Sequence, residues 1–268
     1  MRINTNLNAM IATNQMSKNT ALSGASMEKL STGLRITKAG DDAAGLAVSE
    51  KMRAQIRGME QAERNVQDGI SMVQTAEGAL EEAGNIAQRM RELGVQAGND
   101  TLSDEDRNKV KEELTQLQDE MKKISEETKF NGKKLLNTAG TFTIQAGANS
   151  ETRTITTADL SSIANDLSSI SVSTSAQAQS FVENVDKALT SINDARSALG
   201  AMQNRLEYTA NNLTTSTENL TAAESRIRDV DVAKEMVTLS KLNILNQASQ
   251  AMVSQAKQQP ESVSQLLR

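Results

Sequence analysis

Cysteine, histidine and tryptophan are absent from the 268 residues of this chain, and proline occurs once. The absence of cysteine excludes disulfides and thiolate metal sites, and the absence of histidine excludes the Ser-His-Asp triad and histidine-ligated metals. We therefore expect a protein that is not an enzyme and that holds no metal or other cofactor.

Large aromatic side chains are scarce, since the chain has three Phe and one Tyr. Apolar contacts must come from Leu, Ile, Val, Met and Ala, which suit helices packed along a line better than a thick globular core. No apolar run reaches the ~18 residues of a membrane-spanning helix, and the first residues lack the features of a signal peptide. Taken alone, these absences predict a cytosolic chain without membrane insertion.

The charge balance argues against nucleic acid as a partner. The net charge is -5, and basic residues are mixed with acidic ones along the chain. Binding to phosphates favours a clustered basic surface, which this sequence does not provide.

The strongest pattern is a 3-4 alternation of apolar residues from Val182 to Ile227. Polar residues interrupt it at Arg196, Gln203, Thr217 and Glu224. Such a narrow apolar stripe is typical of a coiled coil. One helix cannot bury its own stripe, so other parts of the chain must cover it.

Other segments have related patterns. Residues 43–97 and 103–128 repeat the 3-4 spacing, with Glu63 and Glu77 inside the first stripe. Residues 141–145 and 152–156 alternate with period two around a turn, which indicates a β-hairpin, and 161–175 reads as a loop that contains at most one short helical turn. We predict an elongated all-α fold: an antiparallel bundle of helical rods, or coiled coil, with a small β-hairpin near 141–156 and paired terminal helices.

The terminal segments each have more than one apolar face. In residues 3–34, one face carries Ile3, Leu7, Met10, Ile11 and Leu22, and another carries Ala9, Ala12, Met16, Met27, Leu30 and Leu34. In the last segment, one face carries Val237, Ile244, Leu245, Ala248 and Met252 with Lys241, Gln255 and Gln259, and Val263 and Leu266 keep the phase. Pro260 disfavours an unbroken helix there. Two apolar faces predict a helix between two partners, one of them from another molecule.

Two short motifs have simpler explanations than chemistry. Ser26 and Lys29 have the Ser-x-x-Lys spacing of penicillin-recognising enzymes, but the accompanying motifs are absent. The acidic run 104–106 lacks the spacing of a Ca²⁺ loop, and it suits the positive end of a helix dipole.

Several longer strings resemble bacterial flagellin. At the amino terminus these are Met1-Arg2-Ile3-Asn4-Thr5-Asn6, Leu30-Ser31-Thr32-Gly33-Leu34-Arg35-Ile36 and Asp41-Asp42-Ala43-Ala44-Gly45-Leu46-Ala47-Val48-Ser49. At the carboxy terminus they are Arg226-Ile227-Arg228-Asp229-Val230-Asp231, Ile244-Leu245-Asn246-Gln247-Ala248 and Pro260 through Arg268. The family's variable outer domains are missing or reduced, as in the short flagellins of Gram-positive bacteria.

The resemblance implies an extracellular structural subunit that self-assembles into the flagellar filament for swimming. It implies inner-core helices at 1–41 and 227–268 and a rod domain at 42–226. The polymerisation residues would be Ile3, Leu7, Met10, Ile11 and Leu22 in the first segment and Val237, Ile244, Leu245, Ala248, Met252, Val263 and Leu266 in the last. Lys241, Gln255 and Gln259 are candidates for lining a wet central channel.

The resemblance also implies partners. Copies of the chain would polymerise with one another, and an export apparatus with its chaperone would secrete them without a cleaved signal. Filament cap and hook-junction proteins would bind the assembly. Arg89, Leu93 and Glu113 would contact neighbouring subunits and are candidates for a contact with a vertebrate Toll-like receptor.

Two alternatives stay open at the level of sequence. A hook-filament junction protein shares both terminal patterns, and its failure to grow long filaments would distinguish it. An intracellular coiled-coil scaffold would instead form a stable soluble dimer and would not be exported.

Overall fold

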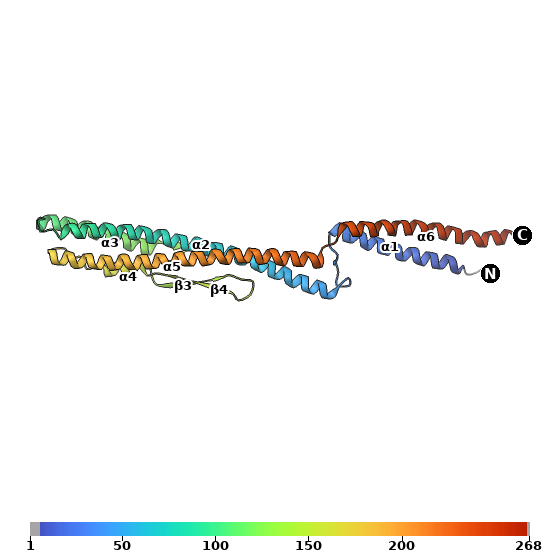
Figure 1. Ribbon diagram of the computed structural model, residues 1–268, viewed down its shortest axis with the longest axis horizontal. Helices are drawn as coiled ribbons and strands as arrows, with labels where there is room; N and C mark the ends of the chain where they lie inside the picture. Colours follow the sequence, from blue (N-terminus) through green and yellow to red (C-terminus); the bar gives the residue numbers. More distant parts are fainter. Residues whose placement is uncertain (1–5, 267–268) are drawn as a thin grey trace. The chain divides into compact units, whose positions relative to one another are not determined.

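A computed structural model describes the backbone of residues 6–266 and the side chains of residues 6–258. Its helices are α1 Leu7–Thr32, α2 Ala43–Ala97, α3 Asp104–Glu127, α4 Leu160–Asp166, α5 Ser175–Arg228 and α6 Val232–Leu266 (Figure 1). Its strands are β1 Lys129–Phe130, β2 Lys133–Lys134, β3 Gly140–Gln145 and β4 Thr152–Thr157. The predicted all-α fold with a small β-hairpin is confirmed.

The chain forms two compact units, whose boundaries fall inside α2 and α5. The rod unit is Gln55–Glu218, and the terminal unit is the described part of Met1–Ala54 with Asn219–Arg268. The predicted domain borders near residues 41 and 227 lie outside these boundaries by several residues.

In the rod unit, α2 and α5 run antiparallel. Arg91 Nε lies 2.6 Å from Asp186 Oδ1, while Glu63 Oε1, earlier in α2, accepts a hydrogen bond from Thr214, later in α5. The predicted stripe of α5 faces inward, because Val185, Ile192, Leu199, Leu206 and Leu213 are all buried. The antiparallel coiled-coil prediction therefore holds within this unit.

The polar interruptions of the two stripes meet each other. Arg196 Nη2 lies 4.0 Å from both Glu77 Oε1 and Glu81 Oε2. Arg196 and Glu77 both occupy stripe positions, so each charge finds its counter-charge across the helix pair, as a partly buried charge requires.

The β3–β4 hairpin has the predicted antiparallel register, with Phe142 opposite Ile155. Asn65 of α2 donates a hydrogen bond to the Gln145 carbonyl at 3.2 Å. A Cβ on Gly69 would overlap Ile144 Cδ1, and one on Gly58 would lie 2.9 Å from Ala148 Cβ. Glycine at these two positions of α2 therefore lets the hairpin pack directly on the helix.

The structure also contains a second strand pair that the sequence analysis missed. β1 and β2 pair antiparallel around Asn131 and Gly132, whose φ angles are +48° and +79°. Two successive positive φ values are the requirement of a type I′ turn, and Asn-Gly is its commonest sequence. In the segment 161–175, where a loop with at most one short helical turn was expected, α4 occupies Leu160–Asp166, and the Asp159 side chain caps it by accepting from Ser162 N.

Candidate functional site

In the terminal unit, α1 and α6 lie side by side and antiparallel, and we call them the terminal pair (Figure 1). Asn6 Nδ2 donates to the Ala256 carbonyl at 2.6 Å, and Ser23 Oγ donates to Asn243 Oδ1 at 3.4 Å. The partner numbers fall on α6 as they rise on α1, so the start of α1 lies beside the later part of α6.

The contact between α1 and α6 is made largely by small and polar residues. The inward positions of α1 recur with 3-4 spacing and are Ala9, Ala12, Met16, Asn19, Ser23, Ser26 and Leu30. Those of α6 are Glu235, Leu239, Leu242, Asn246, Ser249, Val253 and Ala256. Asn19 and Ser26 are only 3% and 6% exposed. Polar residues at coiled-coil core positions fix the register at a cost in stability.

The Asn6 side chain replaces the backbone N–H that Pro260 of α6 lacks. The helix continues through Pro260 to Leu266, where the sequence analysis expected a weakened helix. Proline has no N–H, so the Ala256 carbonyl loses its normal helical donor. The Asn6 side-chain amide bonds to that carbonyl, while its Oδ1 caps α1 by accepting from Ala9 N at 3.1 Å. One side chain therefore satisfies an end group on each helix.

The large apolar side chains of the terminal pair point away from this contact. Their exposed fractions are 60% for Leu7, 52% for Met10, 58% for Ile11, 55% for Leu22, 71% for Val237, 66% for Ile244, 39% for Leu245 and 64% for Met252. Ala248 is exposed as well. We call this set the outward face. Its members are the predicted polymerisation residues whose side chains the structure describes.

Two shallow grooves hollow this surface. One, of about 450 Å³, lies between the helices and is lined by Ile11, Leu245, Ala248 and Met252 among others. The other, of about 460 Å³, runs along α6 beside Met236, Val237, Lys241, Ile244 and Leu245. Leu245 lines both grooves.

The remaining predicted residues of the terminal segments are placed as follows. Lys241 and Gln255 are exposed on α6. Gln259, Val263 and Leu266 belong to α6, beyond the residues whose side chains are described, and Ile3 lies outside the described residues.

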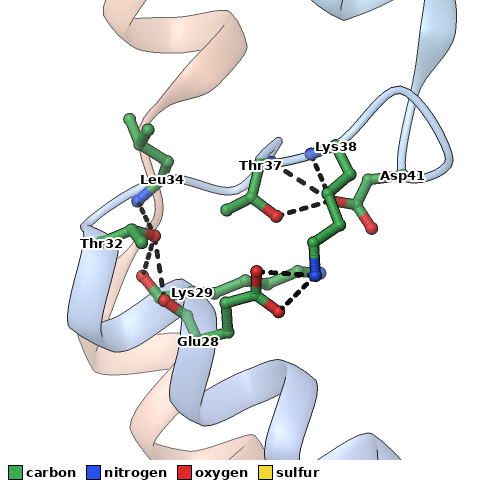
Figure 2. Close-up of polar contacts among 7 residues, drawn as sticks. All are labelled: Glu28, Lys29, Thr32, Leu34, Thr37, Lys38 and Asp41. Atoms are coloured by element: carbon green, nitrogen blue, oxygen red, sulfur yellow. Dashed lines mark hydrogen bonds and ion pairs between the residues drawn. The ribbon is translucent and has the colours of Figure 1, made fainter.

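The linker after α1 is folded by short polar contacts (Figure 2). Asp41 Oδ2 accepts from the backbone N–H groups of Thr37 and Lys38, each at 3.1 Å, and from the Thr37 hydroxyl at 3.0 Å. These bonds, first of all that from the Lys38 N–H, hold the pKa of the Asp41 carboxyl below its usual value. Lys38 Nζ lies 2.8 Å from Glu28, and this bond raises the pKa of Lys38.

The same linker is tied to the junction of α5 and α6. Arg35 N donates to the Arg228 carbonyl at 2.6 Å, and Val230 N donates to the Gly33 carbonyl at 3.0 Å. Gly33 has φ +71°, a conformation at a helix C-terminus that favours glycine. Arg228 Nη1 also lies 2.6 Å from Glu50 Oε1. The turn between the terminal helices and the rod helices is therefore specified by several bonds.

In the rod unit, Arg89 bridges α2 and α3. Its Nη2 lies 2.9 Å from Glu113 Oε1, and its Nη1 lies 3.1 Å from Glu92 Oε2. The bond to Glu113 is the main cause of a raised pKa for the Arg89 guanidinium. Leu93 is only 2% exposed. Arg89 and Glu113 thus share a surface, whereas Leu93 packs beneath it.

Features of other functional classes are lacking in the described part of the chain. Among residues 6–266 no helix is long and apolar enough to cross a bilayer. The same residues contain no cluster of acidic side chains arranged to hold a metal ion. The grooves of the terminal pair and the ion pair at Arg89 are surfaces suited to protein contacts.

Comparisons with known proteins agree with the sequence strings. The bacterial flagellin N-terminal helical region matches residues 3–141, and the C-terminal helical region matches residues 182–267. Flagellin from Halalkalibacterium halodurans is 54% identical and flagellin from Bacillus subtilis is 48% identical, each over the full length of both chains. The flagellar filament 33 kDa core protein of Treponema phagedenis is 44% identical, again over both full lengths.

Two solved structures are similar as well. The crystal structure of Bacillus cereus flagellin has a TM-score of 0.52 and 34% identity, covering 60% of this chain and 94% of its own. A flagellar hook-associated protein from Vibrio parahaemolyticus has a TM-score of 0.60 at 12% identity, covering 70% of this chain and 100% of its own. At that identity the second likeness concerns the fold alone.

Proposed function

Because the chain belongs to the bacterial flagellin family and is a structural subunit of the flagellar filament, we propose that the outward face of its terminal pair is where neighbouring subunits assemble. The observation that carries this proposal is the exposure of eight large apolar side chains on two adjacent helices. An exposed apolar surface of this extent on one pair of helices marks a site of interaction with another protein chain.

Burial of the outward face by other copies of the chain is energetically favourable. Covering a Leu, Ile, Val or Met side chain contributes about 1.5–3 kcal/mol relative to leaving it in water. The polar contact inside the terminal pair offers little such stabilisation, so the two helices gain most of their order from neighbours. Ile3, Val263 and Leu266 would extend the same surface, and Ala248 would let a neighbour approach closely.

We assign the inner core of the filament to residues 1–41 and 227–268, and the surrounding rods to residues 42–226. Lys241, Gln255 and Gln259 would line a wet channel inside that core. The exposure of Lys241 and Gln255 is compatible with this role. Leucine at these positions is expected to preserve polymerisation while altering export.

We further assign a contact surface to Arg89 and Glu113, with Leu93 supporting it from within the rod. In the filament this surface would face a neighbouring subunit, and on free subunits it would be open to a vertebrate Toll-like receptor. The salt bridge fixes the guanidinium in place, which favours directional recognition by a partner.

We assign the export route, the location and the assembly partners of this chain by membership of the flagellin family. The subunit would leave the cell through the flagellar export apparatus with a dedicated chaperone, without a cleaved signal, and act outside the cell. Filament cap and hook-junction proteins would bind the ends of the assembly. Its role would be structural, without catalysis.

Seeded polymerisation tests the proposal. Purified wild-type protein and the conservative variant Ile244→Leu should grow long filaments from sheared seeds, as seen by sedimentation and negative-stain microscopy. Ile244→Ser should raise the critical concentration by roughly tenfold or more, because it removes one apolar contact from the interface. Equal growth of all three proteins would contradict the assignment of this face. Short assemblies that never elongate would instead indicate a hook-filament junction protein.

A further inference from the structure

Methionine is distributed unevenly between the two units. In the terminal unit Met10, Met27, Met236 and Met252 are 52%, 63%, 51% and 64% exposed. In the rod unit Met59, Met72, Met90 and Met121 are 9% exposed or less. The thioether groups that solvent reaches most readily therefore lie on the terminal pair, within the part of the chain that the structure describes.

The composition makes these sulfur atoms the preferred targets of an oxidant. The chain contains no cysteine, histidine or tryptophan, so no thiol, imidazole or indole competes for it. Methionine thioethers react with peroxides to give methionine sulfoxide, and accessible ones react more readily than buried ones. Oxidation of the folded subunit should consequently be concentrated on α1 and α6.

Two of these methionines lie where added polarity would matter most. Met252 lines the groove between the helices with Ile11 and Leu245. Met236 lines the groove along α6 with Val237 and Ile244. A sulfoxide oxygen in either groove would add a strong hydrogen-bond acceptor beside apolar side chains. Polar side chains line the grooves as well, among them Asn8, Gln15 and Asn19 in the first and Ser240 and Lys241 in the second.

We propose that the four exposed methionines of the terminal pair form an oxidation switch for assembly, which rests on the proposed function of the outward face. Met10 and Met252 belong to that face, Met236 lines the groove beside Val237 and Ile244, and Met27 is exposed on α1. Hydrogen peroxide transfers one oxygen atom to each sulfur: the sulfur gives two electrons, an S=O bond forms, the O–O bond breaks, and water leaves with both peroxide protons. Oxidation replaces an apolar sulfur by a polar S=O group, so a neighbour that covers it loses apolar contact and must desolvate the added oxygen. Subunits already in a filament are protected, because their neighbours cover these side chains.

The switch is reversible. Methionine sulfoxide reductases return both sulfoxide epimers to the thioether, using electrons from a thiol reductant. An oxidised subunit is therefore a temporarily unusable subunit, and reduction restores its ability to assemble.

Peroxide treatment of free subunits followed by seeded polymerisation tests the switch. We expect mass spectrometry to locate sulfoxide mainly at Met10, Met27, Met236 and Met252, and the critical concentration to rise about tenfold or more. Treatment with both reductase types should reverse the rise. In intact filaments the same four residues should oxidise several-fold more slowly than in free subunits.

Two variants give the matched comparison. Replacing the four exposed methionines by leucine should leave polymerisation unchanged by peroxide, since leucine cannot be oxidised and has a similar volume. Replacing Met59 and Met72 of the rod unit by leucine should leave the sensitivity of the protein intact.

The failures are distinguishable. If untreated protein does not polymerise, the proposed function fails. If untreated protein polymerises and subunits with confirmed sulfoxides polymerise equally well, the switch is disproved. Equal oxidation in filaments and free subunits, or peroxide inactivation of the four-leucine variant, also overturns it.

Discussion

The rod unit and the terminal pair use their large aliphatic side chains in opposite ways. In the rod unit Leu80, Leu114 and Ile192 are at most 1% exposed, so its helices hold one another through a dry core. In the terminal pair the inward positions include Asn19 and Ser26 beside Leu242, and the eight large apolar side chains of the outward face are exposed to solvent. The difference teaches that one part of the chain is stabilised by its own packing, and the other part is arranged to be stabilised by neighbours.

The largest expected effect comes from removing a core side chain of the rod. Leu114→Ala should lower the free energy of unfolding of the subunit by about 2–5 kcal/mol, because it leaves a cavity in a fully buried site. Ile244→Ala, at a position 66% exposed, should change it by less than about 0.5 kcal/mol. Urea denaturation of free subunits checks both values. If the two changes lower the free energy of unfolding equally, the proposed difference between the rod unit and the terminal pair is wrong.

A smaller effect is expected when the contact inside the terminal pair is made apolar. Asn19→Leu should stabilise the pair by roughly 1–2 kcal/mol, because it replaces a buried amide by a buried aliphatic group. Hydrogen exchange of free subunits should then show slower exchange in both α1 and α6. Asn14→Leu is the matched control, since it makes the same change at an exposed position of α1. The interpretation fails if both variants slow exchange equally, which would reflect helix propensity alone.

The link between Asn6 and the carbonyl at Ala256 should make a contribution of similar or smaller size. Asn6→Ala removes a helix cap and the donor to this carbonyl, and should cost about 0.5–2 kcal/mol of local stability. Pro260→Ala supplies a normal helical N–H to the same carbonyl, so Asn6→Ala should cost less in that background. A double-mutant cycle read by hydrogen exchange measures this coupling. Additive effects would show that the bond contributes nothing to the end of α6.

The smallest expected effect is the acid sensitivity of the linker. The folded state lowers the pKa of Asp41, so its contribution to linker stability is complete above the ordinary carboxyl pKa and is lost as the pH falls through the lowered value. The amide resonances of Thr37 and Lys38 should move together through this titration. In Asp41→Asn the titration should disappear. A wild-type linker whose amides do not respond in the acid range would contradict the role of this carboxylate.

Sequence periodicity was sufficient to predict the rods, because their core positions are large and aliphatic. Glu77 and Arg196 stood out as polar interruptions, and they lie across from each other in the folded rod unit. The outward face of the terminal pair was also recognisable, since residues such as Ile11 and Ile244 recur at helical spacing. The inward contact was recognisable only in part. Ala9, Ala12, Met16 and Leu30 belong to the second predicted apolar face of the first segment, whereas asparagine and serine at core positions look like solvent-facing residues when hydrophobicity is the only guide.

Other features depended on three-dimensional neighbours. The burial of Leu93 agrees with the 3-4 spacing of the buried residues Met90 and Ala97, but the ion pair of Arg89 depends on how α3 packs against α2. The bond from Asn6 to Ala256 joins residues at opposite ends of the chain, so no local pattern predicts that Pro260 is accommodated. The β1–β2 turn was the exception, since Asn131-Gly132 is a local signal of a hairpin.

Accessibility of one outward position before and after assembly tests the central claim most directly. Because the chain has no cysteine, Ile244→Cys gives a single site for maleimide labelling, and Ser169→Cys in the loop after α4 gives a matched exposed control. We predict rapid labelling of both in free subunits, and in filaments a loss of labelling at position 244 with little change at position 169. If position 244 reacts as rapidly in filaments as in free subunits, neighbouring subunits do not cover the outward face.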